Sequence, residues 1–314
     1  MSSLIEQAAQ RLAQLRQAGV ELPDDVLTLR AGTPTEQDIF AAVGAASAAA
    51  LLQRVEEPPH PAAKRVDLDL VALAAQGYLT PNASRSHLAD QYRVIKRPLI
   101  KNAMGKGVAT LNHANLIMVT SALAGEGKSF TSLNLALSIA AEQDNTVMLV
   151  DADVARPSVL RMLGLPQGPG LLDVLENNVD MAEVLLRTNV DKLTLLPSGT
   201  PHARATELLA SDSMSQLLDQ MAQRYPDRII IFDSPPLLLT TESRVLASHM
   251  GQIVIVVHAE KTPQSAVQQA LAAIENCPLK MILLNQASAN ATGGYGYGYG
   301  YGYGYGYNNE AAES

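Results

Sequence analysis

The pattern of apolar and polar residues divides the chain into a helical N-terminal part and a longer part in which strands and helices alternate. From residue 115 onward, short continuous apolar runs alternate with segments of helical periodicity. Continuous hydrophobicity is typical of strands that are covered on both faces, as in a parallel sheet flanked by helices. The pattern therefore predicts an α/β fold with a doubly wound, mostly parallel sheet and helices on both faces. The predicted strands are residues 115–120, 146–151, 193–197, 228–233, 252–258 and 279–285.

The first part of the chain has a different organisation. Residues 2–18 and 36–55 show helical spacing of apolar residues, and three closely spaced prolines after residue 57 end the second pattern. A further helical pattern covers residues 84–104, where Ser84 or Ser86 is a candidate N-cap. We therefore expect three regions: a helical and linker appendage at residues 1–83, an α/β domain at residues 84–290, and a separate tail at residues 291–314.

The first predicted strand is followed by a phosphate-binding loop motif. The apolar run Leu116–Val119 leads into SALAGEGKS, which fits the pattern Ala-x-x-x-x-Gly-Lys-Ser, and a helical pattern begins there. Only small residues let successive backbone N–H groups approach a phosphate closely, and the helix N-terminus adds a partial positive charge at the same place. Lys128 is expected to reach the β- and γ-phosphates and Ser129 to hold Mg²⁺. The alternative, a chance Gly-Lys-Ser at a helix start, fits the strand and helix context less well.

Carboxylates follow two other predicted strands. Asp151 and Asp153 end the run VMLVDAD, and Asp233 ends RIIIFD. Ligands of parallel α/β sheets bind beyond the carboxyl ends of the strands, so these side chains are expected near the phosphate loop. One carboxylate there can orient or deprotonate a hydroxyl acceptor while others arrange Mg²⁺. Each aspartate alone is equally well explained as a helix cap or turn residue; the combination favours phosphoryl transfer.

Composition and charge narrow the function classes. The chain has 314 residues, 47% of them hydrophobic, and a net charge of −8 without a basic block, so a nucleic-acid partner is not expected. The single cysteine, Cys277, cannot form an internal disulfide, which fits a reducing cytoplasm. Charged residues interrupt any signal peptide, and the uncharged residues 39–52 are too few to span a bilayer. We expect a cytoplasmic protein without direct membrane insertion, which a partner recruits to the inner membrane face.

The tail has a repetitive sequence. Residues 293–307 read GGYGYGYGYGYGYGY and contain seven of the ten tyrosines of the chain. Tyr-Gly repeats cannot bury a core and carry the entropy penalty of glycine, which predicts disorder. An inert or self-associating low-complexity segment is the alternative to a functional tail.

Three of these motifs together resemble a known family. SALAGEGKS, VMLVDADVARP and IIIFDSPPLL resemble the Walker A, A′ and B motifs of the bacterial tyrosine kinases (BY-kinases), P-loop enzymes, and the resemblance runs from about residue 84 to the C-terminus. The opening SLIEQAAQRLAQLRQAG is similar to that of the exosortase-associated (PEP-CTERM/XrtA-type) tyrosine autokinases of exopolysaccharide synthesis. The resemblance implies a P-loop NTPase fold and a cytoplasmic, ATP- and Mg²⁺-dependent protein-tyrosine autokinase.

The resemblance also implies roles for individual residues. The catalytic residues are Lys128, Asp151 as the base that receives the tyrosine proton, and Asp153. The nucleotide is bound by Gly125, Glu126, Gly127, Lys128, Ser129, Phe130 and, near the adenine, Asn285. Mg²⁺ is held by Ser129, Asp153 and Asp233. The phosphoacceptors are Tyr295, Tyr297, Tyr299, Tyr301, Tyr303, Tyr305 and Tyr307. Asp90, Arg93 and Lys96, predicted on one broad helix face, match a Glu-x-x-Arg-x-x-Arg assembly motif at which this chain has Asp for Glu and Lys for Arg.

The implied partners are other copies of the chain in a homo-oligomer, a membrane chain-length (co-polymerase) protein as activator, and a cognate tyrosine phosphatase. Two other functions stay open. One is an ATPase of the cell-division or plasmid-partition type, although such proteins carry a lysine early in the loop where this chain has Leu123. The other is a non-catalytic ATP-binding scaffold of a polysaccharide-export complex.

Overall fold

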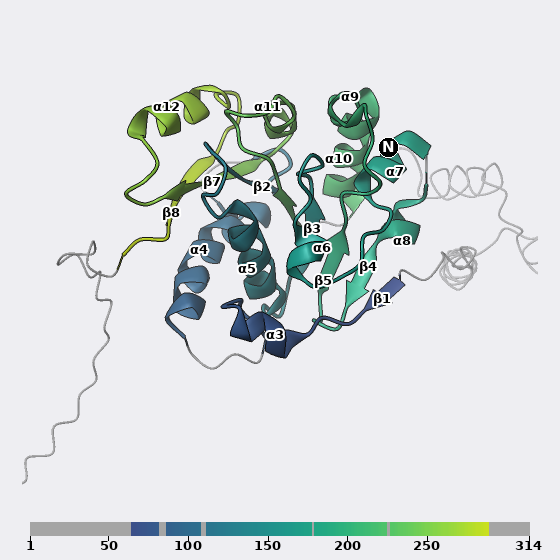
Figure 1. The fold of residues 1–314 in the computed structure, drawn as a ribbon, viewed down its shortest axis with the longest axis horizontal. Helices are drawn as coiled ribbons and strands as arrows, with labels where there is room; N and C mark the ends of the chain where they lie inside the picture. Colours follow the sequence, from purple (N-terminus) through teal and green to yellow (C-terminus); the bar gives the residue numbers. More distant parts are fainter. Residues whose placement is uncertain (1–63, 82–85, 108–110, 178, 225–226, 289–314) are drawn as a thin grey trace, which may run out of the picture. The chain divides into compact units, whose positions relative to one another are not determined.

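The computed structural model describes residues 64–81, 86–107, 111–177, 179–224 and 227–288. Within these residues an eight-stranded sheet has the order β1-β4-β5-β3-β6-β2-β7-β8 (Figure 1). The strands are β1 (Lys64–Val66), β2 (Leu116–Ser121), β3 (Thr146–Asp151), β4 (Leu186–Thr188), β5 (Leu193–Leu196), β6 (Arg228–Asp233), β7 (Gln252–His258) and β8 (Lys280–Asn285). The helices are α3 (Leu70–Ala75), α4 (His87–Ala103), α5 (Lys128–Ala140), α6 (Val159–Met162), α7 (Leu171–Asn177), α8 (Met181–Val184), α9 (Ala205–Leu209), α10 (Asp212–Arg224), α11 (Glu242–Ser248) and α12 (Gln264–Ala272).

The predicted parallel sheet is confirmed. All six predicted strands are present as β2, β3, β5, β6, β7 and β8, and every pairing among them is parallel. The antiparallel pair in the sheet is β4 with β5. Because the strands are parallel, their carboxyl ends gather at one edge of the sheet, where ligands of such folds bind.

The sheet separates two apolar cores. Along β2, Leu116 and Met118 pack into one core, whereas Ile117 and Val119 pack into the other, as the period of two in a strand requires. Helices α3, α4 and α5 cover one face, and α7, α9, α10, α11 and α12 cover the other (Figure 1). Both faces of the central strands are therefore buried, which explains their uninterrupted apolar sequences.

The α/β unit begins earlier in the chain than predicted. Strand β1 pairs with β4 in parallel, and Leu68, Leu73 and Leu79 are buried in the core under α4 and α5. The predicted boundary at residue 84 therefore falls inside the folded unit. Residues 1–63 lie outside the described part of the chain, and so does the predicted tail beyond residue 288.

The helix predicted at residues 84–104 is α4. Ser86 is its N-cap, and its hydroxyl accepts a hydrogen bond from the backbone N–H of Ala89 at 3.1 Å. Tyr92, Lys96 and Leu99 form its buried face. Among the helices of the described residues, none has the length and apolarity needed to cross a bilayer.

Candidate functional site

The loop between β2 and α5 forms a concave cradle of backbone N–H groups. Gly125 and Gly127 have φ angles of 82° and 91°, which side chains other than glycine rarely tolerate. Gly127 is the N-cap of α5 and makes no side-chain cap bond, and the helix ladder begins with the N–H of Thr131. The N–H groups of residues 128–130 are therefore available to an anion at the helix N-terminus.

Glu126 holds the loop in this shape. Its side chain is buried, and one carboxylate oxygen accepts a hydrogen bond from the N–H of Leu123 at 2.7 Å. The other oxygen accepts a hydrogen bond from the hydroxyl of Thr262, which lies in the segment after β7. The Nδ2 of Asn285, at the end of β8, donates to the carbonyl of Glu126 at 2.9 Å. The structure thus brings Asn285 to the loop, and its predicted place near an adenine stays a prediction.

The three aspartates meet at the carboxyl edge of the sheet. Asp151 and Asp233 end neighbouring strands β3 and β6 and are partners in the strand register. Lys128, the first residue of α5, forms an ion pair with Asp153 at 2.7 Å between Nζ and Oδ2. All three carboxylates are buried, with Asp153 the most exposed at 4%. The grouping expected from the strand ends is therefore present.

Asp151 is held from one side only. Its Oδ2 accepts the backbone N–H groups of Ser158 and Val159 at 3.0 and 2.9 Å, at the start of α6. Its Oδ1 is buried and has no hydrogen-bond partner among the described residues. Burial raises the pKa of Asp151 to about 7, with repulsion from Asp233 adding to the effect and the two backbone donors opposing it. A carboxylate with one free oxygen and such a pKa can accept a proton near neutral pH.

Asp233 is surrounded by hydroxyl groups. Ser132, one helical turn after the loop, donates to its Oδ1 at 3.1 Å, and Ser158 donates to its Oδ2 at 3.4 Å. Burial raises the pKa of Asp233, whereas the nearby Lys128 ammonium and the hydroxyls of Ser129 and Ser132 lower it. Ser129 and Asp233 therefore lie together, as the predicted metal site requires.

These residues fit a nucleotide with its metal. The carboxylates of Asp153 and Asp233 and the hydroxyl of Ser129 supply oxygen ligands, and the glycine loop and the free N–H groups of α5 supply anion donors at the same place. No cluster of three or more His, Cys, Asp or Glu side chains that would enclose a metal by itself occurs in the described ranges. Mg²⁺ usually takes one or two carboxylates and keeps water and phosphate oxygens as its other ligands.

Sequence reasoning missed Ser132 and Ser158, and the structure places Lys96 differently from the prediction. The role of Phe130 in binding the nucleotide stays a prediction. Serines are common at helix starts, so nothing in the pattern marked either one as a partner of Asp233. The Phe130 ring packs on Tyr78 with centroids 5.2 Å apart. The Lys96 side chain, 8% exposed, binds the Ser138 carbonyl of α5 and the carboxylate of Glu142, just beyond the end of that helix. Asp90 and Arg93 form an exposed ion pair, so Lys96 does not share their exposed face.

Comparisons with known proteins agree with this geometry. A family model described as an AAA domain matches residues 114–286. The tyrosine-protein kinase YwqD of Bacillus subtilis is 30% identical over 194 residues, which cover 62% of this chain and 78% of that protein. The chain belongs to the bacterial tyrosine kinase family. A second tyrosine-protein kinase of this family, ptk of Acinetobacter johnsonii, is 33% identical over 181 residues, which cover 57% of this chain and 24% of that protein.

A solved structure supports the same assignment. The VpsO kinase domain is 26% identical and superimposes with a TM-score of 0.52, covering 65% of this chain and all of that one. Bacterial tyrosine kinases of quite different lengths thus share the domain described here, and the chain spans about a quarter of the longer relative. The predicted phosphoacceptor tyrosines, Tyr295 to Tyr307, lie outside the described residues.

Proposed function

We propose that this chain is an ATP-dependent protein-tyrosine autokinase whose acceptors are the seven tyrosines of residues 295–307. The observation that carries the proposal is Asp151, a buried carboxylate with one unpartnered oxygen next to Asp233 and near Asp153, which pairs with Lys128 of the phosphate-binding loop. Membership of the bacterial tyrosine kinase family and the presence of a Tyr-Gly tail in the same chain support it.

The loop residues would bind the phosphates of ATP. The N–H groups of Gly125, Gly127 and the first turn of α5 would hold the phosphate oxygens, and Lys128 would contact the β- and γ-phosphates. Ser129, Asp153 and Asp233 would hold Mg²⁺, which when bound neutralises charge on the phosphates. Ser132 and Ser158 orient the Asp233 carboxylate for this role.

Asp151 would act on the acceptor. As a tyrosine oxygen forms its bond to the γ-phosphorus, the bond from that phosphorus to the β,γ-bridging oxygen breaks, and ADP leaves with the electron pair. The tyrosine proton passes to Asp151 Oδ1, while the N–H groups of Ser158 and Val159 keep Oδ2 in place. The pKa of about 7 gives Asp151 the basicity that such a transfer needs at neutral pH.

The tail would be phosphorylated in trans within a homo-oligomer. Asp90 and Arg93 on the exposed face of α4 are candidate assembly residues, and Lys96 would support them by fixing α4 on α5. We place the activity in the regulation of exopolysaccharide synthesis and export, with the exosortase-associated branch as the specific assignment. A membrane chain-length protein would activate the kinase and recruit it to the inner membrane face, and a tyrosine phosphatase would reverse the modification.

One experiment tests the kinase directly. The purified full chain is treated with a tyrosine phosphatase, freed of it, incubated with Mg²⁺ and ATP, and mapped for phosphotyrosine by mass spectrometry. Phosphate on residues 295–307 that is absent in Lys128→Met and strongly reduced in Asp151→Asn is the expected result. Steady ATP hydrolysis without tyrosine modification would instead establish a partition-type ATPase, and binding without turnover would establish a scaffold.

A further inference from the structure

The outer edge of β8 is free to pair with another strand. β8 ends the sheet, and within the described ranges no strand lies beyond it. The carbonyls of Leu279 and Asn285 accept bonds from Ile253 and Ala259 on the β7 side, each at 2.9 Å. Successive residues of a strand turn their backbone groups to opposite sides, so Lys280, Ile282 and Leu284 present theirs outward. Such an edge is a template for a further strand.

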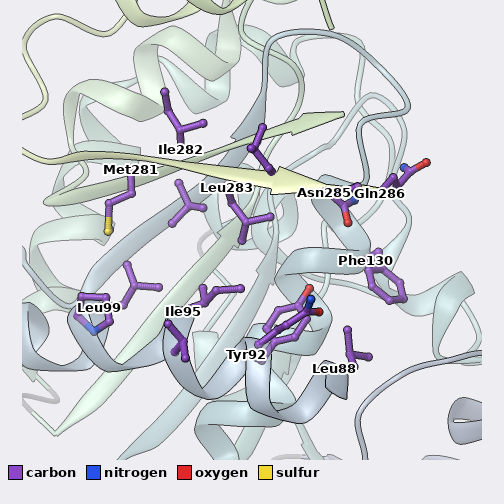
Figure 2. Close-up of a pocket in the computed structure, with 16 residues that line it drawn as sticks. Leu88, Tyr92, Ile95, Leu99, Phe130, Met281, Ile282, Leu283, Asn285 and Gln286 are labelled. Carbon is purple, nitrogen blue, oxygen red and sulfur yellow. The ribbon is translucent and has the colours of Figure 1, made fainter. Parts of the chain in front are cut away.

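A groove runs beside this edge. The cavity between α4 and β8 has a volume of about 650 Å³, and no charged side chain lines it. Figure 2 shows side chains of α4 pointing toward the strand across the opening. The apolar lining includes Leu88, Tyr92, Ile95, Leu99, Met281 and Leu283.

Exposed apolar side chains concentrate in the same place. Among the described residues, five large hydrophobic side chains are exposed, and three of them border this edge. Val94 of α4 is 73% exposed and lines the groove. Ile282 and Leu284 of β8 are 53% and 67% exposed, and they line this groove as well as a second hollow toward α12. Apolar surface gathered at one place marks a binding site more often than scattered residues do.

The chain itself carries a segment suited to this edge. The described part of the chain ends at Ser288, and the Tyr-Gly run begins five residues later, at residue 293. Five residues of extended chain span at most about 18 Å, so the run begins close to the end of β8. Residues 286–309 contain no charged side chain, so they match an uncharged groove. A strand alternates its side chains between two faces, and strict Tyr-Gly alternation therefore puts every tyrosine on one face.

We propose that residues 293–307 bind antiparallel to β8 as an added edge strand, with their tyrosine rings over the α4–β8 groove. Residues 286–292 would form the connecting turn, and an antiparallel edge strand on a parallel sheet is common. Gly293 would then pair with Asn285, and Tyr295 and Tyr297 would lie beside Leu283 and Met281, with their rings on the apolar lining and their hydroxyls toward water. The other tyrosines would extend beyond the six residues of β8.

This docking would also hold the acceptors away from the catalytic edge, a consequence that rests on the proposed function. Four strand steps separate β8 from β3, which carries Asp151. At about 4.8 Å per step this is roughly 19 Å, so a docked tyrosine cannot reach Asp151 of its own chain. A phosphorylated tyrosine, with its charge of about −1.5 to −2, would not stay over an uncharged groove. The tail is therefore bound at the edge of β8 before phosphorylation, and phosphorylation releases it from that edge.

Hydrogen exchange tests the docking without any nucleotide. The phosphatase-treated full chain is compared by mass spectrometry with a synthetic peptide of residues 289–314. We expect those amides of residues 293–307 that pair with β8, every second one along its six residues, to exchange on the order of tenfold more slowly in the full chain than in the peptide. Equal exchange rates in the two samples would overturn the proposal.

Three variants separate strand addition from other causes of protection. Val94→Glu places a charge at the groove, and Ile282→Pro removes an outward N–H without touching the β7 side; each should bring exchange of the tail to within about twofold of the peptide. Rewriting residues 295–306 as three Tyr-Tyr-Gly-Gly repeats keeps the composition but divides the tyrosines between both faces, and should do the same. Val71→Glu, at an 81% exposed position of α3 away from the groove, is the matched control and should change nothing.

The remaining outcomes also decide the matter. Protection that persists in all three variants, or that disappears on dilution, would show another docking place or a second copy and would overturn the proposal. If the amides of β8 were protected from exchange but those of the tail were not, another segment would occupy the edge of β8, and the proposal would be overturned. If Ile282→Pro fails to fold, Val94→Glu and the rewritten tail still decide. Since no ATP is present, a failed kinase assay leaves this result unaffected.

Discussion

Gly127 shows how tightly one residue of the loop is constrained. A Cβ at this position would lie 2.1 Å from the Asn285 Nδ2, and the φ of 91° disfavours any side chain. We expect Gly127→Ala to lower the free energy of unfolding by about 2–5 kcal/mol, from backbone strain and the clash together, and to abolish nucleotide binding. Urea denaturation and calorimetric titration measure the two effects.

Gly164→Ala is the matched control for Gly127. Its φ of 69° is also left-handed, but a Cβ there meets nothing within 4 Å, so only the strain remains. Removing the opposing amide in the double variant Gly127→Ala, Asn285→Ala should restore part of the stability, which a double-mutant cycle detects. Equal losses in the Gly127 and Gly164 variants would contradict the clash.

Asp151 makes stability depend on pH in the absence of metal and nucleotide. Its folded pKa, about 7, lies above the unfolded value near 3.9, so the folded state takes up a proton as the pH falls through 7 while the unfolded state stays ionised. The free energy of unfolding should therefore rise by on the order of 1 kcal/mol between pH 8 and pH 6, and the gain is lost as the pH rises again.

The test of Asp151 is a set of urea denaturation curves in a chelating buffer. Asp151→Asn lacks the titrating group, so its stability should change less over the same pH interval. Parallel curves for the two proteins would show that the carboxyl group does not titrate in this range.

The predicted site residues that the structure brings together share one property. Lys128, Ser129, Asp151 and Asp233 are fixed by short-range rules: a loop before a helix and carboxylates at strand ends. Ser132 and Ser158 were not predicted because their partner, Asp233, is distant in the sequence. Only the packing of α5 and α6 on the sheet brings the two serines to Asp233. Hydrogen bonds between residues that are far apart in the chain are the contacts that are hardest to predict from a single sequence.

At the scale of elements, Lys96 ties α4 to α5. Its ammonium binds the Ser138 carbonyl at 2.5 Å and the Glu142 carboxylate at 2.6 Å. Lys96→Met should cost about 1–3 kcal/mol of stability, because the buried carbonyl loses its donor. Arg93→Met, which breaks only an exposed ion pair on the same helix, should cost less than about 1 kcal/mol. Thermal denaturation compares the two variants.

The same pair of variants separates folding from assembly. If Arg93 contacts a neighbouring copy, Arg93→Met lowers the oligomer mass in light scattering while leaving stability nearly unchanged. A Lys96→Met variant as stable as the wild type would show that the α4–α5 contact does not need the ammonium.

The elements that sequence reasoning found and missed differ in length and burial. Strands such as β6, with five buried residues out of six, leave an unmistakable apolar run. β1 and β4 have three residues each, and both include exposed or half-buried charged side chains. Their strand state depends on pairing with each other and with β5, so no local pattern could reveal them, and the domain boundary was placed too late for the same reason.

At the scale of the whole molecule, the net charge sets an expectation for assembly. Seven phosphotyrosines would add roughly −10 to −14 charges, more than the −8 of the unmodified chain. Repulsion between phosphorylated tails in an oligomer should then favour assemblies of fewer copies. We expect the mass from light scattering to be lower after incubation with Mg²⁺ and ATP than after phosphatase treatment. Lys128→Met handled in the same way should keep the larger mass, since its tail stays unmodified.

Because salt screens repulsion between exposed charges over about 10 Å at 0.1 M and about 3 Å at 1 M, high salt should restore the larger mass of the phosphorylated wild type. Equal masses for the two wild-type samples at low salt would show that tail charge does not control assembly.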